Sequence, residues 1–329
     1  MFRRVVGFTC ASLMLGTAGA AEPPPTGSLV LESKIPLGDI RGRIDHFAID
    51  LDRRRLYVAE LGNDSVGVVD LTAGETTRTI SGVREPQGIG YSRSSDTLYV
   101  ASGGDGSVRL YNGRDLSVVG RIDLGSDADN VRVDEAGKRV YVGYGSGALG
   151  VIDSGTRQAL PPIRLDGHPE SFQLETNGPL IFVNVPEIAS ITVVDRQATG
   201  RHATWSTSGL RENFPMALDE HGGRLFSVFR RPPRLGVMEM STGRLIATAA
   251  TCGDADDVFF DARREQVYVI CGDGFVDVVP VRAGPYQVTS HIATVAGART
   301  GLFVPSLDRL FVGVRALGTA AAVWVFRIP

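Results

Sequence analysis

A six-residue pattern that recurs through almost the whole chain limits the fold more than any other feature. In its first copy, Arg55-Leu-Tyr-Val-Ala-Glu60, an arginine precedes a run of branched, aromatic and small residues. Related segments begin 41 to 44 residues apart, at Thr97, Arg139, Leu180, Arg224, Gln266 and Arg309. A spacing this constant is the signature of a repeat architecture.

Each repeat carries the signals for four short antiparallel strands. In the first repeat they cover His46–Asp50, Leu56–Glu60, Val66–Asp70 and Thr76–Ile80, with Gly, Asn and Asp in the turns between them. The absence of a 3.6-residue apolar stripe excludes a solenoid of helices. Four strands in each repeat are typical of a β-propeller blade. The sequence therefore predicts an all-β fold, a single seven-bladed β-propeller with four-stranded antiparallel blades.

The two ends of the chain predict how the ring closes. The last repeat has strand signals only at Gly301–Val304, Leu310–Val314 and Val323–Ile328, so its outermost strand is missing. One strand, Leu29–Ile35, is left over at the other end of the chain. We expect this N-terminal strand to pair with Val323–Ile328, which would leave no open sheet edge between the first and last blades.

The first residues have the features of a secretory signal peptide. Arg3 and Arg4 precede an apolar run from Val5 to Leu15, and Ala18-Gly-Ala20 fits a cleavage site. We therefore predict a signal peptide over 1–20, a Pro-rich linker over 21–28, and the propeller over 29–329. The protein would be exported to a bacterial periplasm, without a membrane span. Its two remaining cysteines, Cys252 and Cys271, could pair there, and the sequence leaves that question open.

The charge balance bears on possible partners. Removing the predicted signal peptide leaves 32 basic and 37 acidic residues, a difference of −5. Such a surface offers no positive field for nucleic-acid phosphates, so we expect no nucleic-acid binding. We also expect a monomer, because a propeller closes on itself.

The repeat resembles that of the YVTN-family β-propellers, the periplasmic proteins similar to YncE. The matching segments are Leu56-Tyr-Val-Ala with Val66-Gly-Val-Val-Asp70, Leu98-Tyr-Val-Ala with Val108-Arg-Leu-Tyr, and Val140-Tyr-Val-Gly with Leu149-Gly-Val-Ile-Asp153. The resemblance covers residues 29–329 and implies a periplasmic propeller, although no repeat keeps the full Tyr-Val-Thr-Asn. It implies little about activity, because propellers host many functions. It would also allow binding of single-stranded nucleic acid, which the charge argues against.

Polar residues at the mouth of the central channel form the candidate site. The loop that enters each innermost strand opens on the same face as the loop between the second and third strands. Aligning the repeats places Asp45, Gln87, Asp129, Glu170, Phe214, Asp256 and Arg299 at one equivalent position, with His46, Asn130 and Asp257 among the residues that follow. The predicted ligand-binding residues are Asp45, His46, Gln87, Asp129, Asn130, Glu170, Asn213, Asp256, Asp257 and Arg299.

Two kinds of chemistry are open to these residues. Carboxylates from Asp129, Glu170, Asp256 and Asp257 could hold Ca²⁺, which prefers oxygen ligands. Alternatively, these side chains could bond local backbone in turns, as Asp and Asn commonly do. His46 is a candidate general base. Arg299 could orient an anionic group or neutralise the acidic ring.

The sequence favours a non-catalytic role without excluding catalysis. It contains no Cys-x-x-Cys-His, His-Glu-x-x-His or Gly-x-Ser-x-Gly motif. We therefore expect an exported binding or scaffold protein that presents the channel mouth to a small ligand or a partner protein. The alternative is a propeller enzyme, a metal-assisted lactonase or other hydrolase, or a lyase, acting at the acidic mouth.

Overall fold

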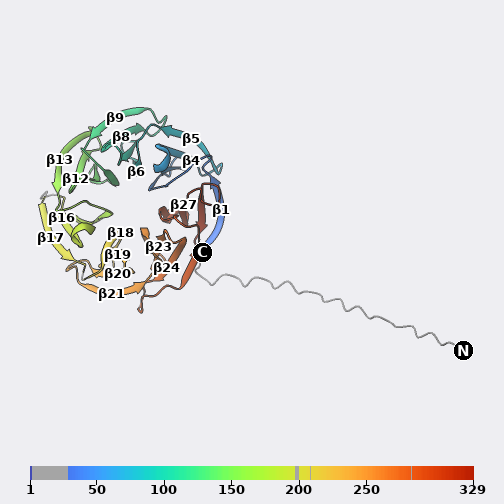
Figure 1. The fold of residues 1–329 in the computed structure, drawn as a ribbon. Coiled ribbons are helices and arrows are strands. Elements are labelled where there is room, and N and C mark those ends of the chain that lie inside the picture. Colours follow the sequence, from blue (N-terminus) through green and yellow to red (C-terminus); the bar gives the residue numbers. More distant parts are fainter. Residues whose placement is uncertain (2–28, 197–199, 208, 283) are drawn as a thin grey trace.

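The computed structural model describes Met1 and residues 29–196, 200–207, 209–282 and 284–329. These residues form seven four-stranded antiparallel sheets arranged as blades around a central channel (Figure 1). The predicted all-β propeller is therefore confirmed. The predicted linker, and the predicted signal peptide apart from Met1, lie outside the described residues. No helix among the described residues is long and apolar enough to cross a membrane.

Each blade runs from an innermost strand at the channel to an outermost strand at the rim (Figure 1). The first three blades are built from β2 (Phe47–Asp50), β3 (Arg55–Glu60), β4 (Ser65–Asp70) and β5 (Glu75–Ser81); β6 (Pro86–Ser92), β7 (Thr97–Ser102), β8 (Ser107–Asn112) and β9 (Val118–Asp123); and β10 (Ala128–Asp134), β11 (Arg139–Tyr144), β12 (Ala148–Asp153) and β13 (Gln158–Arg164).

The remaining blades follow the same order until the chain returns to its beginning. They are built from β14 (Phe172–Leu174), β15 (Leu180–Val185), β16 (Ser190–Asp195) and β17 (Gly200–Ser206); β18 (Arg211–Asp219), β19 (Arg224–Arg231), β20 (Pro233–Glu239) and β21 (Leu245–Ala250); β22 (Ala255–Asp261), β23 (Gln266–Cys271), β24 (Phe275–Pro280) and β25 (Ser290–Ala293); and β26 (Gly301–Val304), β27 (Arg309–Val314), β28 (Ala322–Arg327) and β1 (Val30–Pro36). Short 3-10 turns cover η1 (Leu61–Asn63), η2 (Pro186–Ile188) and η3 (Pro305–Leu307).

The N-terminal strand closes the ring as the sequence predicts. β1 pairs antiparallel with β28, with Ile35 opposite Val323 and Lys34 opposite Trp324. The Lys34 ammonium lies 3.9 Å from the centre of the Trp324 ring, which adds a cation–π contact to the pairing. The observed strands differ from the predicted segments by one residue at each end.

The recurring pattern forms the second strand of each blade because it is buried on both faces. Along β3, Leu56 and Val58 pack toward the blade that contains β1, while Tyr57 and Ala59 pack toward the blade of β6–β9. All four side chains are fully buried. A strand between two apolar surfaces carries apolar residues at successive positions rather than at alternate ones. Sheet-to-sheet packing of this kind repeats around the ring.

Ion pairs link neighbouring blades on the face opposite the channel mouth. Arg53, in the turn after β2, contacts Asp50 at 2.7 Å and Asp96 of the next blade at 2.8 Å. Arg264, in the turn after β22, contacts Asp261 and Asp308 in the same way, at 3.0 Å each. In these blades the charged side chains of this face serve to join one blade to the next.

Cys252 and Cys271 form a disulfide, a pairing that the sequence leaves open. The bond ties the segment that enters β22 to the end of β23 within one blade. Asp254 and Asp256 lie in this tethered segment or at the beginning of β22, so the disulfide helps to hold them at the channel mouth. A cross-link between two parts of one blade removes conformational freedom from the unfolded chain.

Candidate functional site at the channel mouth

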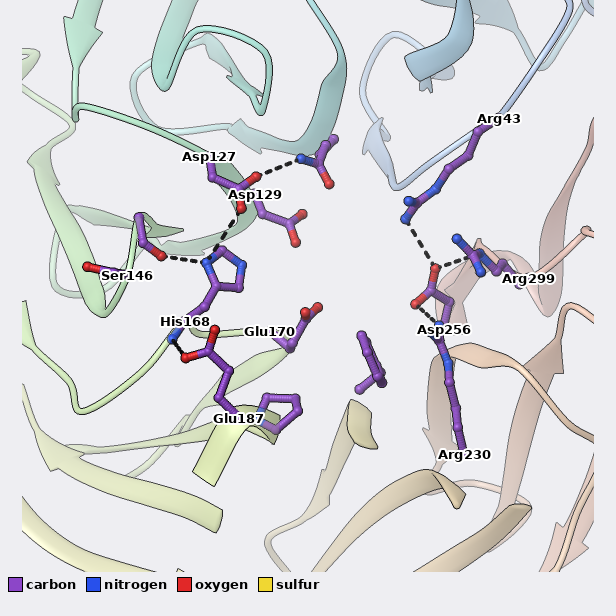
Figure 2. Close-up of a pocket in the computed structure, with 14 residues that line it drawn as sticks. Arg43, Asp127, Asp129, Ser146, His168, Glu170, Glu187, Arg230, Asp256 and Arg299 are labelled. Carbon is purple, nitrogen blue, oxygen red and sulfur yellow. Dashed lines mark hydrogen bonds and ion pairs between the residues drawn. The ribbon is translucent and has the colours of Figure 1, made fainter. Parts of the chain in front are cut away.

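A cavity of about 440 Å³ opens at the channel mouth, and residues at equivalent positions in successive repeats line it (Figure 2). The position that the sequence aligns supplies Gln87, Asp129, Glu170, Phe214, Asp256 and Arg299. The position two residues earlier supplies Arg43, Asp127 and His168. Loops between the second and third strands supply Gly145, Ser146, Pro186, Glu187 and Arg230. Equivalent positions in successive repeats therefore line a single polar cavity.

A glycine lets two innermost strands approach each other where Asp129 enters the site. A Cβ atom at Gly88 of β6 would lie 2.2 Å from the backbone oxygen of Asp129 in β10. That distance is far below van der Waals contact, so any side chain at position 88 would push the two blades apart. Gly88 therefore helps to fix the position of Asp129 at the mouth.

One wall of the cavity is built around Asp256 (Figure 2). Its carboxylate lies 2.7 Å from Arg230, 2.9 Å from Arg299 and 3.4 Å from Arg43. Burial raises the pKa of Asp256, and the guanidinium groups of Arg299, Arg230 and Arg43 oppose that effect. Arg299 also donates to both carboxylate oxygens of Asp254, at 3.0 Å each. We call these three arginines and Asp256 the arginine wall.

The opposite side of the cavity is acidic (Figure 2). His168 Nδ1 donates to the backbone oxygen of Gly145 at 2.6 Å and lies 3.7 Å from Asp127. Asp127 also accepts a hydrogen bond from Gln87 at 3.3 Å, and Glu187 accepts one from the His168 backbone at 3.4 Å. We call Asp127, Asp129, Glu170 and Glu187 the acidic wall.

Asp129 differs from Asp127 and Glu187, whose carboxylates accept hydrogen bonds from protein atoms. Only 7% of the residue is exposed, and no described residue donates a hydrogen bond to its Oδ1. Burial, reinforced by Asp45 and Glu170, raises the pKa of Asp129 to about 7, although His46 lowers it. Burial and Asp256 likewise raise the pKa of Glu170 to about 7. Two carboxyl groups in one cavity therefore lose protons near neutral pH.

Replacing Asp129 with Asn is expected to stabilise the protein most at alkaline pH. The pKa of Asp129 in the folded protein, about 7, lies above its ordinary value of 3.8, so protonation favours folding and this benefit is lost as pH rises through 7. Asn cannot ionise. As pH rises from 5 to 8, we expect the free energy of unfolding of the variant to increase relative to that of the parent by about 2–3 kcal/mol, or about 4 °C in Tm. Melting both proteins at each pH tests this, and a pH-independent difference would contradict it.

His46 lies beneath the mouth and lines a second cavity of about 270 Å³ with Asp257 and Arg132. Its Nε2 is 3.7 Å from Asp45, and its Nδ1 is 3.4 Å from Asp257. Although burial lowers it, the carboxylates of Asp257 and Asp45 raise the pKa of His46 to about 10. His46 is therefore a cation at neutral pH, where it cannot accept a proton as a general base.

The other predicted residues occupy different places. Asp45 is buried between Arg43, at 3.0 Å, and His46. Asn213 is fully buried within its blade, where its amide donates to Asn184 Oδ1 and Ser190 O at 2.9 Å each. Asn130 is also buried and does not line the mouth cavity. The structure thus gathers Gln87, Asp129, Glu170, Asp256 and Arg299 of the predicted set around one cavity.

The predicted calcium ligands are divided among three surroundings. Asp129 and Glu170 lie on the acidic wall, Asp256 contacts three arginines, and Asp257 contacts His46. Within the described ranges, no group of three or more His, Cys, Asp or Glu side chains is placed so that it could hold a metal ion. Calcium binding stays a prediction, with Asp129 and Glu170 as the oxygen ligands that face the cavity.

The cavity also contains charged or titratable side chains that are absent from the predicted set, namely Arg43, Asp127, His168, Glu187 and Arg230. A signal for them exists in the repeat register. Arg43 occupies the position of Asp127 and His168, two residues before the aligned one, and Arg230 is equivalent to Gly145 and Pro186 in the loops after the second strands. Comparing these two positions across all repeats, as well as the aligned one, would have found both arginines.

Comparisons with known proteins identify the fold and no more. No family model matches the sequence, and no curated protein matches it. A chain in the crystal structure of the mitotic checkpoint complex is similar, with a TM-score of 0.78 and 12% identity over 98% of this chain and 99% of that one. A chain of hydrazine synthase from Kuenenia stuttgartiensis has a TM-score of 0.75 and 14% identity over 94% and 99%. The protein is a β-propeller, and its resemblance to the YVTN family stays a prediction.

Proposed function

We propose that the protein is an exported binding protein that holds a small polar ligand at its channel mouth and does not transform it. The observation that carries the proposal is Asp129, a buried carboxylate that faces a cavity of about 440 Å³ and has an oxygen without a hydrogen-bond donor. A buried charge without a partner is costly, so such a group in a cavity suits a ligand. The volume fits a small molecule better than a protein surface, although a partner protein could cover the same face.

Export is part of this proposal. The basic, apolar and small-residue segments of residues 1–20 support a cleaved signal peptide. The disulfide between Cys252 and Cys271 supports an oxidising compartment such as the periplasm, because disulfides are rare in the cytosol.

A thermal-stability screen against small charged and neutral compounds, with calcium chloride among them, tests the binding role. A ligand that binds only the folded protein raises Tm by mass action. We expect at least one compound to raise Tm in the parent and in Asp52→Asn, but not in Asp129→Asn. Asp52 is an exposed partner of Arg93 at the opposite face, so its variant is a matched control. Failure of every compound, or shifts that persist in Asp129→Asn, would overturn the proposal.

A second candidate function is acid–base catalysis at the same mouth, by a hydrolase, lactonase or lyase. It is favoured by Glu170, because a carboxyl group with a pKa of about 7 beside a cavity can both donate and accept a proton at neutral pH. His46, already protonated there, would act only through its charge. Turnover of an ester or lactone that disappears in Glu170→Gln would establish this function instead.

A further inference from the structure

We propose that the ligand of the channel mouth is an organic amine whose ammonium group lies against Asp129 and Glu170. This inference deepens the proposed binding function and rests on it. The charge, the hydrogen-bonding capacity and the shape of the cavity all favour an ammonium group.

The charge around the cavity is unevenly balanced. Around the arginine wall, Arg43, Arg230, Arg299 and protonated His46 are matched by Asp45, Asp254, Asp256 and Asp257, which they contact. The acidic wall carries four carboxyl groups. Among the described residues, no arginine or lysine lies within ion-pair distance of them, and the His168 ring lies 3.7 Å from Asp127. The arginine wall therefore needs no further anion, whereas the acidic wall attracts positive charge.

Hydrogen bonding points to the same group. Asp127 and Glu187 accept hydrogen bonds from protein atoms, but Asp129 Oδ1 accepts none from a described residue. Figure 2 shows the carboxylates of Asp129 and Glu170 directed into the space between the two walls. An ammonium group offers three N–H donors and a positive charge, and its hydrogen bonds to carboxylates are among the strong ones. Two carboxylates are enough to hold it.

An ammonium group fits these contacts better than calcium does. Calcium is coordinated by six to eight oxygen ligands at about 2.3–2.6 Å. Among the residues that the structure describes, no three acidic or histidine side chains are placed to supply such a shell. Burial is the first cause of the raised pKa of Asp129 and of Glu170, and neighbouring carboxylates add to it.

The rest of the cavity limits what the amine can carry. Phe214 lines it, and the Arg230 guanidinium lies 3.8 Å from the centre of its ring, which makes a flat surface between the walls. An alkyl or aromatic body can pack there, and guanidinium N–H groups of the arginine wall can bond an oxygen at the far end. An amine with a terminal oxygen therefore fits at least as well as a plain alkylamine.

Calorimetric titration with matched four-carbon probes tests the inference. The four-carbon probes are butylamine, 4-aminobutanoate and butanoate, and calcium chloride is titrated beside them. All titrations are made at constant ionic strength and pH 8, where Asp129 and Glu170 are ionised and an alkylammonium stays protonated. We expect both amines to bind the parent protein and butanoate to bind at least tenfold more weakly. Asp129→Asn and Glu170→Gln should each weaken amine binding at least tenfold, while Asp52→Asn should leave it unchanged.

The outcomes separate this inference from the binding proposal on which it rests. Binding of butanoate as tight as that of butylamine, or amine binding that survives in both variants, would overturn the amine. Binding of calcium alone would overturn it too, in favour of the metal site, and would leave ligand binding at the mouth intact. If neither amine binds while another screened compound binds in a way that depends on Asp129, only the proposal of an amine ligand is rejected. If no compound binds at all, both proposals fall.

Discussion

Ile35→Asp is expected to open the propeller ring and to be the most damaging single substitution in the N-terminal strand. Ile35 is 5% exposed and packs with Phe311, Val323 and Val325 in the core beside β1. A carboxylate there would be buried without a partner, so we expect a loss of about 4 kcal/mol or more, or at least about 6 °C in Tm. Thermal unfolding followed by circular dichroism measures the loss.

Ser33→Asp is the matched control for this substitution. Ser33 lies on the same strand but is exposed, so an added carboxylate stays in water. Its effect should remain within about 0.5 kcal/mol. Equal destabilisation by the two substitutions would show that β1 tolerates neither charge, and would argue against specific burial of Ile35 as the cause.

Asp256→Asn is expected to lower Tm by about 5–8 °C, which corresponds to about 3–5 kcal/mol, because the three ion pairs of Asp256 outweigh the burial that raises its pKa. The substitution keeps the shape of the side chain but leaves Arg43, Arg230 and Arg299 around an uncharged group. The side chain of Asp256 is only 10% exposed, so water cannot replace the lost charge well. The melting temperature at pH 7 measures the effect.

Two comparisons sharpen this test. Asp52→Asn makes the same chemical change in an exposed pair with Arg93, and should cost less than about 1 kcal/mol. Asp129→Asn makes it at the repeat-equivalent position and should stabilise the protein at alkaline pH. Opposite signs for positions 129 and 256 follow from their surroundings, since no described cation lies within ion-pair distance of Asp129, whereas Asp256 contacts three arginines. The same sign at both positions would contradict this electrostatic account.

The fold could be predicted because its determinants are local and repeated. The pattern of Arg55–Glu60 encodes a strand buried on both faces, and its spacing encodes a blade. Ring closure followed from one missing strand at the end of the chain and one left over at the beginning. Equivalent positions in a ring face the same axis, so alignment alone could place Gln87, Glu170 and Arg299 around one space.

The contacts within the site could not be predicted in this way. Arg43, Arg230 and Arg299 come from three different blades, and their convergence on Asp256 depends on side-chain reach across the ring. Asn213 was expected at the mouth, but β18 already begins at Arg211, and its pairing with β19 shifts register between Asn213 and Met216. Asn213 therefore lies inside its blade. Sequence spacing records neither side-chain length nor such a bulge.

The pairing of β1 with β28 has a consequence for the order in which the protein is made. β1 is synthesised long before β28, with which it pairs, since Lys34 lies opposite Trp324. Until residue 327 has been added, a nascent chain has an incomplete last blade with an unpaired edge, which is the kind of surface that aggregates. The long wait costs little entropy. Joining ends seven repeats apart rather than one adds less than about 2 kcal/mol, because loop-closure entropy grows only with the logarithm of length.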